Sequence, residues 1–148
     1  MSIKQEIIIR SPKQDVEFAD YYSLRWKILR QPWGQMLGSE KDEFENVSIH
    51  RIAILNNVIV AVARLHFIEN NSAQIRYMAV AENYEKKGLG TLMLEELEKI
   101  AIEKNIETIY LHSRGIAVAF YKKQGYSVIK KSHLLFNEIQ HFKMIKVL

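Results

Sequence analysis

A short glycine-containing loop between a predicted strand and a predicted helix most constrains what this chain can fold into. The strand is indicated by the apolar run that ends at residues 77–80, Tyr-Met-Ala-Val. After a polar stretch comes Gly88-Leu89-Gly90, and the apolar residues behind it recur at helical spacing: Leu89, Leu92, Met93, Leu97, Ile100 and Ala101. The first turn of a helix leaves backbone N–H groups without partners, and the helix dipole favours an anion there. The loop is therefore predicted to cradle a pyrophosphate, with Lys86 and Lys87 adding positive charge on its rim.

Two other common phosphate-binding loops are absent from the sequence. A P-loop requires Gly-x-x-x-x-Gly-Lys-Ser/Thr and a dinucleotide fold requires Gly-x-Gly-x-x-Gly, and neither pattern occurs. Taken alone, a Gly-x-Gly pair is more typical of glycines that only shape the start of a helix. The loop therefore needs a second motif before it can indicate a function.

The remaining elements follow in a mixed order. Strands are predicted at residues 3–9, 50–55, 58–67, 74–80, 108–112, 126–131 and 140–147, and helices at 11–29, 89–101 and 117–124. Residues 35–46 are polar and predict a loop or a short helix. Asn56-Asn57 suits a two-residue hairpin turn, whereas the crossover through the helix at 89–101 implies a parallel pair of strands. In the strand at 74–80, we expect Ile75, Tyr77 and Ala79 to share one face.

Length and composition indicate one ordinary domain that spans residues 1–148. The chain is 48% hydrophobic and 26% charged, and it contains no cysteine for a disulfide, a cysteine–zinc site or a thiol nucleophile. The sequence shows neither a signal peptide nor an apolar stretch of bilayer length, so we expect a cytoplasmic chain without a membrane partner. The net charge of +4 is spread along the chain without a basic block, and no nucleic-acid partner is expected.

A second motif, combined with the loop, resembles the GNAT family of N-acetyltransferases. The family pattern Gln/Arg-x-x-Gly-x-Gly/Ala matches residues 85–90, with Glu85 in place of glutamine or arginine. The family pattern aromatic-Tyr-x-x-x-Gly-Phe/Tyr matches residues 120–126, Phe-Tyr-Lys-Lys-Gln-Gly-Tyr. The resemblance implies an α/β fold of the GNAT type. Its mixed, mostly antiparallel central sheet has a parallel pair splayed at the cofactor site, with helices on both faces.

The resemblance also implies that acetyl-CoA is the acyl donor and that no metal is required. Pantetheine would pair with the main chain of the central strand, and a backbone N–H near Ala79 or Val80 would polarise the thioester carbonyl. The backbone from Lys86 to Thr91 would hold the pyrophosphate. The implied cofactor-binding residues are Met78, Ala79, Val80, Glu85, Lys86, Lys87, Gly88, Leu89, Gly90, Thr91, Phe120 and Tyr121.

By the same resemblance, an amine attacks the thioester directly and Tyr121 protonates the departing thiolate. An alternative is that Tyr121 only packs against the pantetheine arm. The candidates for the general base are His112, Glu138 and His141, and a chain of water molecules could replace them.

The acceptor is expected to be a primary amine on a small molecule or a peptide, and the sequence does not say which. The resemblance places Arg25, Arg30 and Trp33 in one wall of the acceptor site, and pairing through the late strands would make a homodimer. The alternative function is a non-catalytic acyl-CoA-binding module, which Glu85 and the lack of an obvious base favour.

Overall fold

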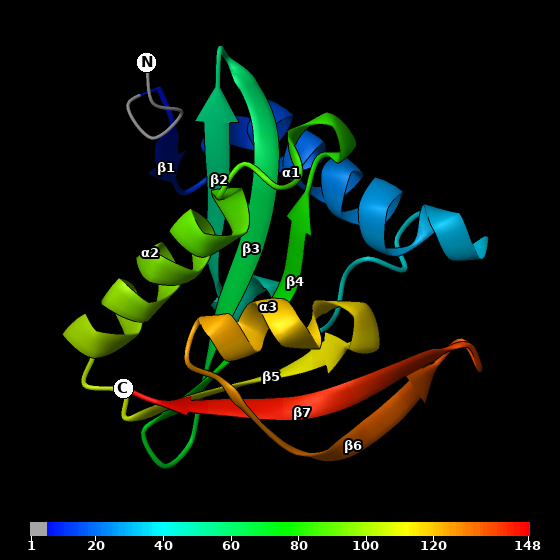
Figure 1. Cartoon of the computed structure of the whole chain (residues 1–148). Helices are drawn as coiled ribbons and strands as arrows, with labels where there is room; N and C mark the ends of the chain where they lie inside the picture. The colour runs from blue at the N-terminus through cyan, green and yellow to red at the C-terminus, as the bar shows by residue number, and fades with distance from the viewer. Residues whose placement is uncertain (1–5) are drawn as a thin grey trace.

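Seven strands form one sheet in the part of the chain, residues 6–148, that this computed structural model describes (Figure 1). The strands are β1 (Ile8–Arg10), β2 (Ile49–Leu55), β3 (Val58–Ile68), β4 (Ser72–Val80), β5 (Thr108–Arg114), β6 (Ser127–Leu135) and β7 (Ile139–Val147). Their order in the sheet is β1-β2-β3-β4-β5-β7-β6. Residues 3–5 of the first predicted strand lie outside the described residues.

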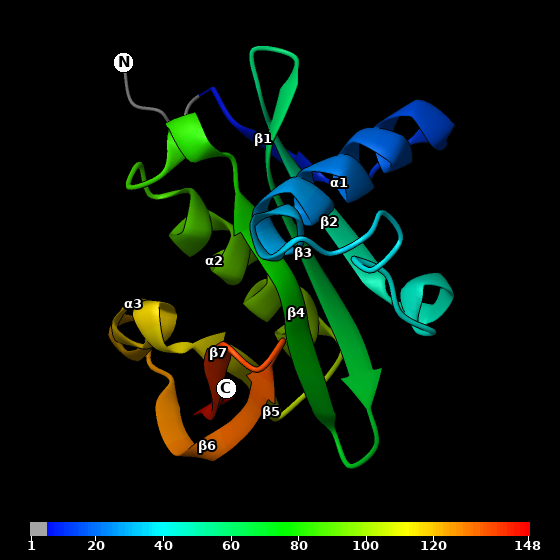
Figure 2. The same cartoon turned by 90° about the vertical axis from the view of Figure 1, so that its right-hand side faces the viewer.

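Three α-helices cover the two faces of the sheet: α1 (Gln14–Leu29), α2 (Leu89–Glu103) and α3 (Val118–Lys123). Figure 2 shows α1 on one face and α2 and α3 on the other. The main core cluster gathers the buried face of α2 with residues of β3, β4 and β5, and a smaller cluster lies under α1. Short 3-10 helices occur at η2 (Gln31–Trp33), η3 (Glu45–Val47), η4 (Glu82–Tyr84) and η5 (Gly115–Ala117). No helix among residues 6–148 has the length and apolar character that crossing a membrane requires.

The expected mixed sheet is confirmed. Its only parallel pair among the described strands is β4–β5, and every other neighbouring pair is antiparallel. The parallel pairing extends only from Ser72 to Gln74 on β4 and from Thr108 to Tyr110 on β5. Beyond these residues the two strands diverge, as their ribbons show in Figure 1. The sheet is therefore open between β4 and β5 beyond Gln74 and Tyr110.

A β-bulge at Tyr77 overturns the expected alternation along β4. Tyr77 has a φ of 57°, in the left-handed region that side chains rarely adopt, and the register with β3 shifts there. Ile75 packs in the core cluster under α2, whereas Ala79 packs in the cluster under α1. The prediction that Ile75, Tyr77 and Ala79 share one face was wrong because the extra residue of a bulge reverses the alternation.

Local signals in the sequence have mixed outcomes. Asn56 and Asn57 have φ values of 51° and 66°, as a two-residue hairpin between β2 and β3 requires. By contrast, Ser11 does not cap α1, whose N-cap is Lys13, two residues later. There the Lys13 N–H donates to the Glu17 carboxylate at 2.6 Å. The predicted strand at 126–131 was too short, since β6 runs on to Leu135.

Candidate active site

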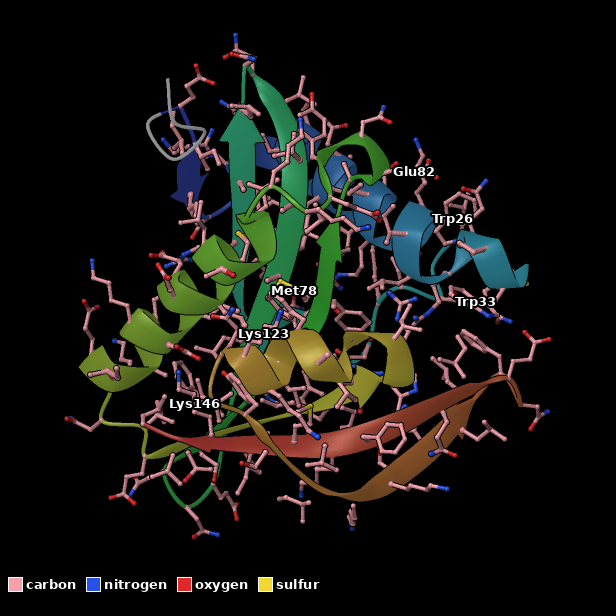
Figure 3. The ribbon with its side chains drawn as sticks, viewed as in Figure 1. Trp26, Trp33, Met78, Glu82, Lys123 and Lys146 are labelled. Atoms are coloured by element: carbon pink, nitrogen blue, oxygen red, sulfur yellow. The ribbon has the colours of Figure 1, made fainter. Side chains whose placement is uncertain are left out.

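A cavity of about 350 Å³ opens where β4 and β5 separate. Side chains from both strands line it, together with residues from the end of α1, from η2, from α3 and from the β6–β7 hairpin. In Figure 3, Met78 on β4 and Trp33 in η2 mark two sides of this cavity. Its polar lining consists of Arg30, Trp33, Gln74, Arg76, Tyr77, His112, Ser113, Arg114, Tyr121, His133 and His141. Ala117 of η5 also lines the cavity, so the splayed strands bring residues from eight elements around one space.

The predicted phosphate loop precedes α2, and its backbone geometry explains Gly88. Gly88 is the N-cap of α2 and has a φ of 83°, while Lys86 has a φ of 60°. A Cβ on Gly88 would meet no atom within 4 Å. The glycine is therefore needed for its backbone conformation, and the space beside it stays clear. No side chain caps this end of α2, so the first-turn N–H groups remain available to an anion.

Gly90 serves a different purpose, because it joins the two sequence motifs. A Cβ on Gly90 would lie 3.0 Å from Cζ of Phe120. The Phe120 ring in turn packs edge-on against Tyr121, with ring centroids 5.0 Å apart. Gln124 adds a second link, since its Nε2 donates to Thr91 Oγ1 at 3.1 Å. The start of α2 and the helix α3 are therefore fitted to each other.

Tyr121 is buried on α3 and lines the cavity. Its hydroxyl has no hydrogen-bond partner among the described residues, and burial raises the pKa of Tyr121 to about 12. The side chain is therefore a neutral proton donor at any pH near 7.

Two of the three predicted base candidates reach the same cavity. His112 on β5 and His141 on β7 line it, together with His133 on β6, which the sequence analysis missed. The His133 and His141 rings stack at 4.4 Å, and His112 lies 5.3 Å from His133. Glu138, by contrast, is exposed in the turn between β6 and β7 and is not part of the lining. The structure therefore groups the histidines with Tyr121 and leaves Glu138 outside.

Loss of hydration favours the uncharged form of these histidines, although His133 is partly exposed to solvent. It lowers the pKa of His112 to about 4 and also lowers the pKa values of His133 and His141. His112 Nδ1 is buried without a hydrogen-bond partner. His141 Nδ1 lies 3.0 Å from the Ile139 carbonyl oxygen, which can only accept, so a neutral His141 keeps the lone pair on Nε2. The cavity therefore contains uncharged imidazoles with nitrogen atoms free for a ligand.

Four guanidinium groups surround the ring of Tyr77 at the bulge. Their Cζ atoms lie 4.1 Å (Arg25), 4.6 Å (Arg76), 4.9 Å (Arg64) and 5.6 Å (Arg30) from the ring centroid. Such positions are favourable because the faces of an aromatic ring attract cations. Arg25 is completely buried and does not line the cavity, so the expectation that it contacts the acceptor was wrong. Arg30 and Trp33 do line the cavity, and their contact with the acceptor stays a prediction.

Two carboxylates on the loop after α1 complete this cluster. Asp42 accepts from Arg64 at 2.6 Å and from Arg76 at 2.9 Å, and Glu45 accepts from Arg25 and Arg64 at 2.9 Å. The Arg64 hydrogen bond lowers the pKa of Asp42 to about 2 against the opposing effect of burial. The cluster ties this loop to β3 and β4. Arg76 was missed as a cavity residue because regular alternation gave no sign of the bulge beside it.

Comparisons with known proteins agree with this geometry. Over 137 residues the chain is 28% identical to a protein of Bacillus subtilis (strain 168) that bears the provisional name acetyltransferase, a match covering 90% of each chain. A provisionally named N-acetyltransferase structure from Lactobacillus plantarum superposes with a TM-score of 0.84 at 19% identity, over 96% of this chain and 98% of the other. A GNAT family acetyltransferase from Elizabethkingia anophelis, solved with acetyl-CoA bound, gives a TM-score of 0.78 at 15% identity, over 97% and 99%. A model of the acetyltransferase (GNAT) family matches residues 18–126. The chain therefore belongs to the GNAT family and is an N-acetyltransferase of that type.

Proposed function

We propose that this enzyme transfers an acetyl group from acetyl-CoA to a primary amine by direct attack. One observation carries the proposal: Phe120 joins the free helix start at Gly90 to Tyr121, which faces the cavity between β4 and β5. If the pyrophosphate binds to the backbone from Lys86 to Thr91, the attached pantetheine arm would extend from there into the cavity. The acetyl-CoA bound in the related Elizabethkingia anophelis structure supports the same donor.

The main chain of β4 offers donors toward the gap. The Ala81 N–H donates to the Val60 carbonyl on β3 at 2.8 Å. Successive N–H groups of a strand point to opposite edges, so the N–H of Val80 points toward β5, where no strand pairs with it. The same alternation directs the N–H of Met78 into the gap and that of Ala79 toward β3. Met78 and Val80, rather than Ala79, are therefore the groups that would bind pantetheine and polarise the thioester carbonyl.

The proposed step balances without a covalent enzyme intermediate. The amine nitrogen attacks the carbonyl carbon of the thioester, the C–N bond forms, and the C–S bond breaks. The thiolate takes a proton from the neutral Tyr121 hydroxyl. The amine loses its proton to an imidazole nitrogen that lines the cavity or to a water molecule. His112 and His141 both offer such a nitrogen, and the structure favours both over the exposed Glu138.

A second candidate function, binding of acyl-CoA without chemistry, has one observation in its favour. The pKa of His112, about 4, makes that imidazole a weak base near neutral pH. Release of CoA thiol from acetyl-CoA in the presence of amines separates the two candidates, because a binding module would release none. The raised thermal stability that bound CoA confers is expected for both.

The cradle is tested by Gly88→Trp, which fills the clear space in front of the α2 N-terminus. We expect the affinity for CoA, measured by calorimetric titration, to fall by at least about tenfold. Gly38→Trp is the matched control, since Gly38 also has a positive φ, 99°, with no atom within 4 Å of its would-be Cβ. Equal CoA affinity in both variants would remove the cradle from this loop.

A further inference from the structure

The charged side chains that line the cavity between β4 and β5 are all cationic. Arg30, Arg76 and Arg114 line it, and in the described part of the chain no aspartate or glutamate does. We propose that the acceptor is a small amine that also bears an oxyanion, either a carboxylate or a phosphate, and that this oxyanion binds among these guanidiniums. The proposal rests on the acetyl transfer proposed above and names its acceptor class.

The carboxylates near the cavity are already engaged elsewhere. Asp42 and Glu45 together serve three guanidiniums, those of Arg25, Arg64 and Arg76. A third carboxylate, that of the buried Glu40, accepts from the Gly38 N–H, so positive charge is in excess once Arg30 and Arg114 are counted. A ligand oxyanion would offset this excess, and its hydrogen bonds to guanidinium would be charge-assisted.

Arg114 and Arg30 have donors to spare. The Arg114 guanidinium stacks 5.6 Å from the Trp33 ring and makes no hydrogen bond or ion pair with any residue from 6 to 148. Arg30 donates from Nε to the Ser39 carbonyl and from Nη1 to the Leu29 carbonyl, both at 3.0 Å, and its Nη2 has no partner among residues 6–148. A guanidinium presents its donors in a planar fork that matches carboxylate and phosphate oxygens.

The histidine group adds donors without adding negative charge. His112 Nδ1 is buried without a hydrogen-bond partner among residues 6–148, and the His141 Nε2 keeps its lone pair for a ligand. Among the described residues, no group of histidine, cysteine, aspartate or glutamate side chains is arranged to hold a metal ion. An uncharged imidazole can donate to an oxyanion from one nitrogen and accept from an amine at the other.

This field also suits the chemistry of the amine. Nearby positive charge disfavours an ammonium group and lowers its pKa, which raises the fraction of the acceptor in its reactive, neutral form. A diamine would bring a second cation into the same field and be repelled. The arrangement therefore selects for anionic acceptors and compensates for a weak base.

The test compares four amines of similar length in the CoA-release assay: 4-aminobutyrate, O-phosphoethanolamine, butylamine and putrescine. We expect kcat/KM for one of the two anionic amines to exceed that for butylamine by at least about tenfold, with putrescine lowest. The better of the two anionic amines tells carboxylate from phosphate. Preference for putrescine or butylamine would overturn the proposal while leaving acetyl transfer intact.

Variants of Arg114 locate the effect. Arg114→Gln is expected to raise KM for the anionic amine about tenfold without changing the KM for acetyl-CoA, and Arg114→Glu to shift the preference toward putrescine. Lys99→Gln removes an equal charge at an exposed position on α2 and should change neither value.

If none of the four amines is acetylated, binding decides the question. In the CoA complex, the anionic amines should shift the imidazole NMR signals of His112, His133 and His141, and butylamine should not. Absence of that shift overturns the proposal. Failure of the protein to bind CoA at all would instead overturn the proposed function.

Discussion

The guanidinium of Arg25 stacks 4.1 Å from the centre of the Tyr77 ring, at the one residue of β4 whose φ is positive. A bulky residue in that conformation is strained and persists only where its surroundings hold it. Here the ring of Tyr77 lies among four guanidiniums, three of which two carboxylates after α1 hold in place, while backbone carbonyls hold that of Arg30. The bulge that parts β4 from β5 is therefore supported by a side-chain cluster outside the cofactor slot.

Removing the Tyr77 ring should destabilise the fold strongly. Tyr77→Ala leaves a cavity and four facing cations, and we expect a loss of about 3–5 kcal/mol in the free energy of unfolding. Tyr77→Phe is the control, because it keeps the ring and the Tyr77 hydroxyl has no hydrogen-bond partner among residues 6–148; it should cost less than about 1 kcal/mol. Urea unfolding measures both values. Similar values for the two variants would show that the ring does not support the bulge.

The sequence was sufficient for the parts of the fold that depend on local chemistry. The positive φ values at Asn56-Asn57 and Gly88 are predictable because few other residues tolerate that conformation. The helix α2 is predictable because its apolar face is regular. The bulge at Tyr77 escaped prediction because nothing in a tyrosine signals that conformation. Its cause lies in contacts with residues far along the chain, Arg25 and Arg64.

Some residues of the candidate site could be predicted from the sequence, and others could not. Tyr121 and the glycine loop follow from motifs, whereas Arg76 and His133 reach the cavity only through the bulge and through the unforeseen length of β6. The absence of carboxylates from the cavity is a property of the assembled lining. No single segment of the sequence shows it.

The contact between Gly90 and Phe120 predicts a measurable coupling. Gly90→Ala would push a Cβ to 3.0 Å from the Phe120 ring, and Phe120→Leu removes that ring. We expect the double variant to be more stable than the sum of the single effects by about 1 kcal/mol. Gly88→Ala provides the comparison, because its cost of about 1–2 kcal/mol comes from the positive φ and should not depend on Phe120. Strict additivity for Gly90 and Phe120 would contradict the contact.

The histidines predict an early loss of stability on acidification. Burial lowers the pKa of all five: His50, His66, His112, His133 and His141. Between the unfolded pKa of about 6.5 and the folded values, the unfolded chain binds more protons, so the free energy of unfolding falls as pH falls. The loss should begin near pH 6.5, well above the range in which Asp42, with a pKa of about 2, becomes protonated.

Urea midpoints at pH 8, 6.5, 5.5 and 4.5 measure this loss. His112→Gln should flatten the curve, because the pKa of His112, about 4, lies well below the unfolded value. A midpoint that stays constant from pH 8 to pH 4.5 would be incompatible with buried, uncharged histidines.

Replacing Tyr121 with phenylalanine should separate chemistry from binding. The substitution removes the hydroxyl and keeps the packing against Phe120, so we expect kcat to fall by about 10²–10⁴-fold with little change in CoA affinity. Because the pKa of Tyr121 is about 12, the wild-type rate should show no loss from its deprotonation up to about pH 10.

Tyr126→Phe is the matched control, since the Tyr126 hydroxyl donates to Glu98 at 2.8 Å and Tyr126 does not line the cavity. Its kcat should match the wild type even if its stability falls. If Tyr121→Phe also turned over at the wild-type rate, Tyr121 would serve only to pack the pantetheine arm, and the thiolate would leave without a protein acid.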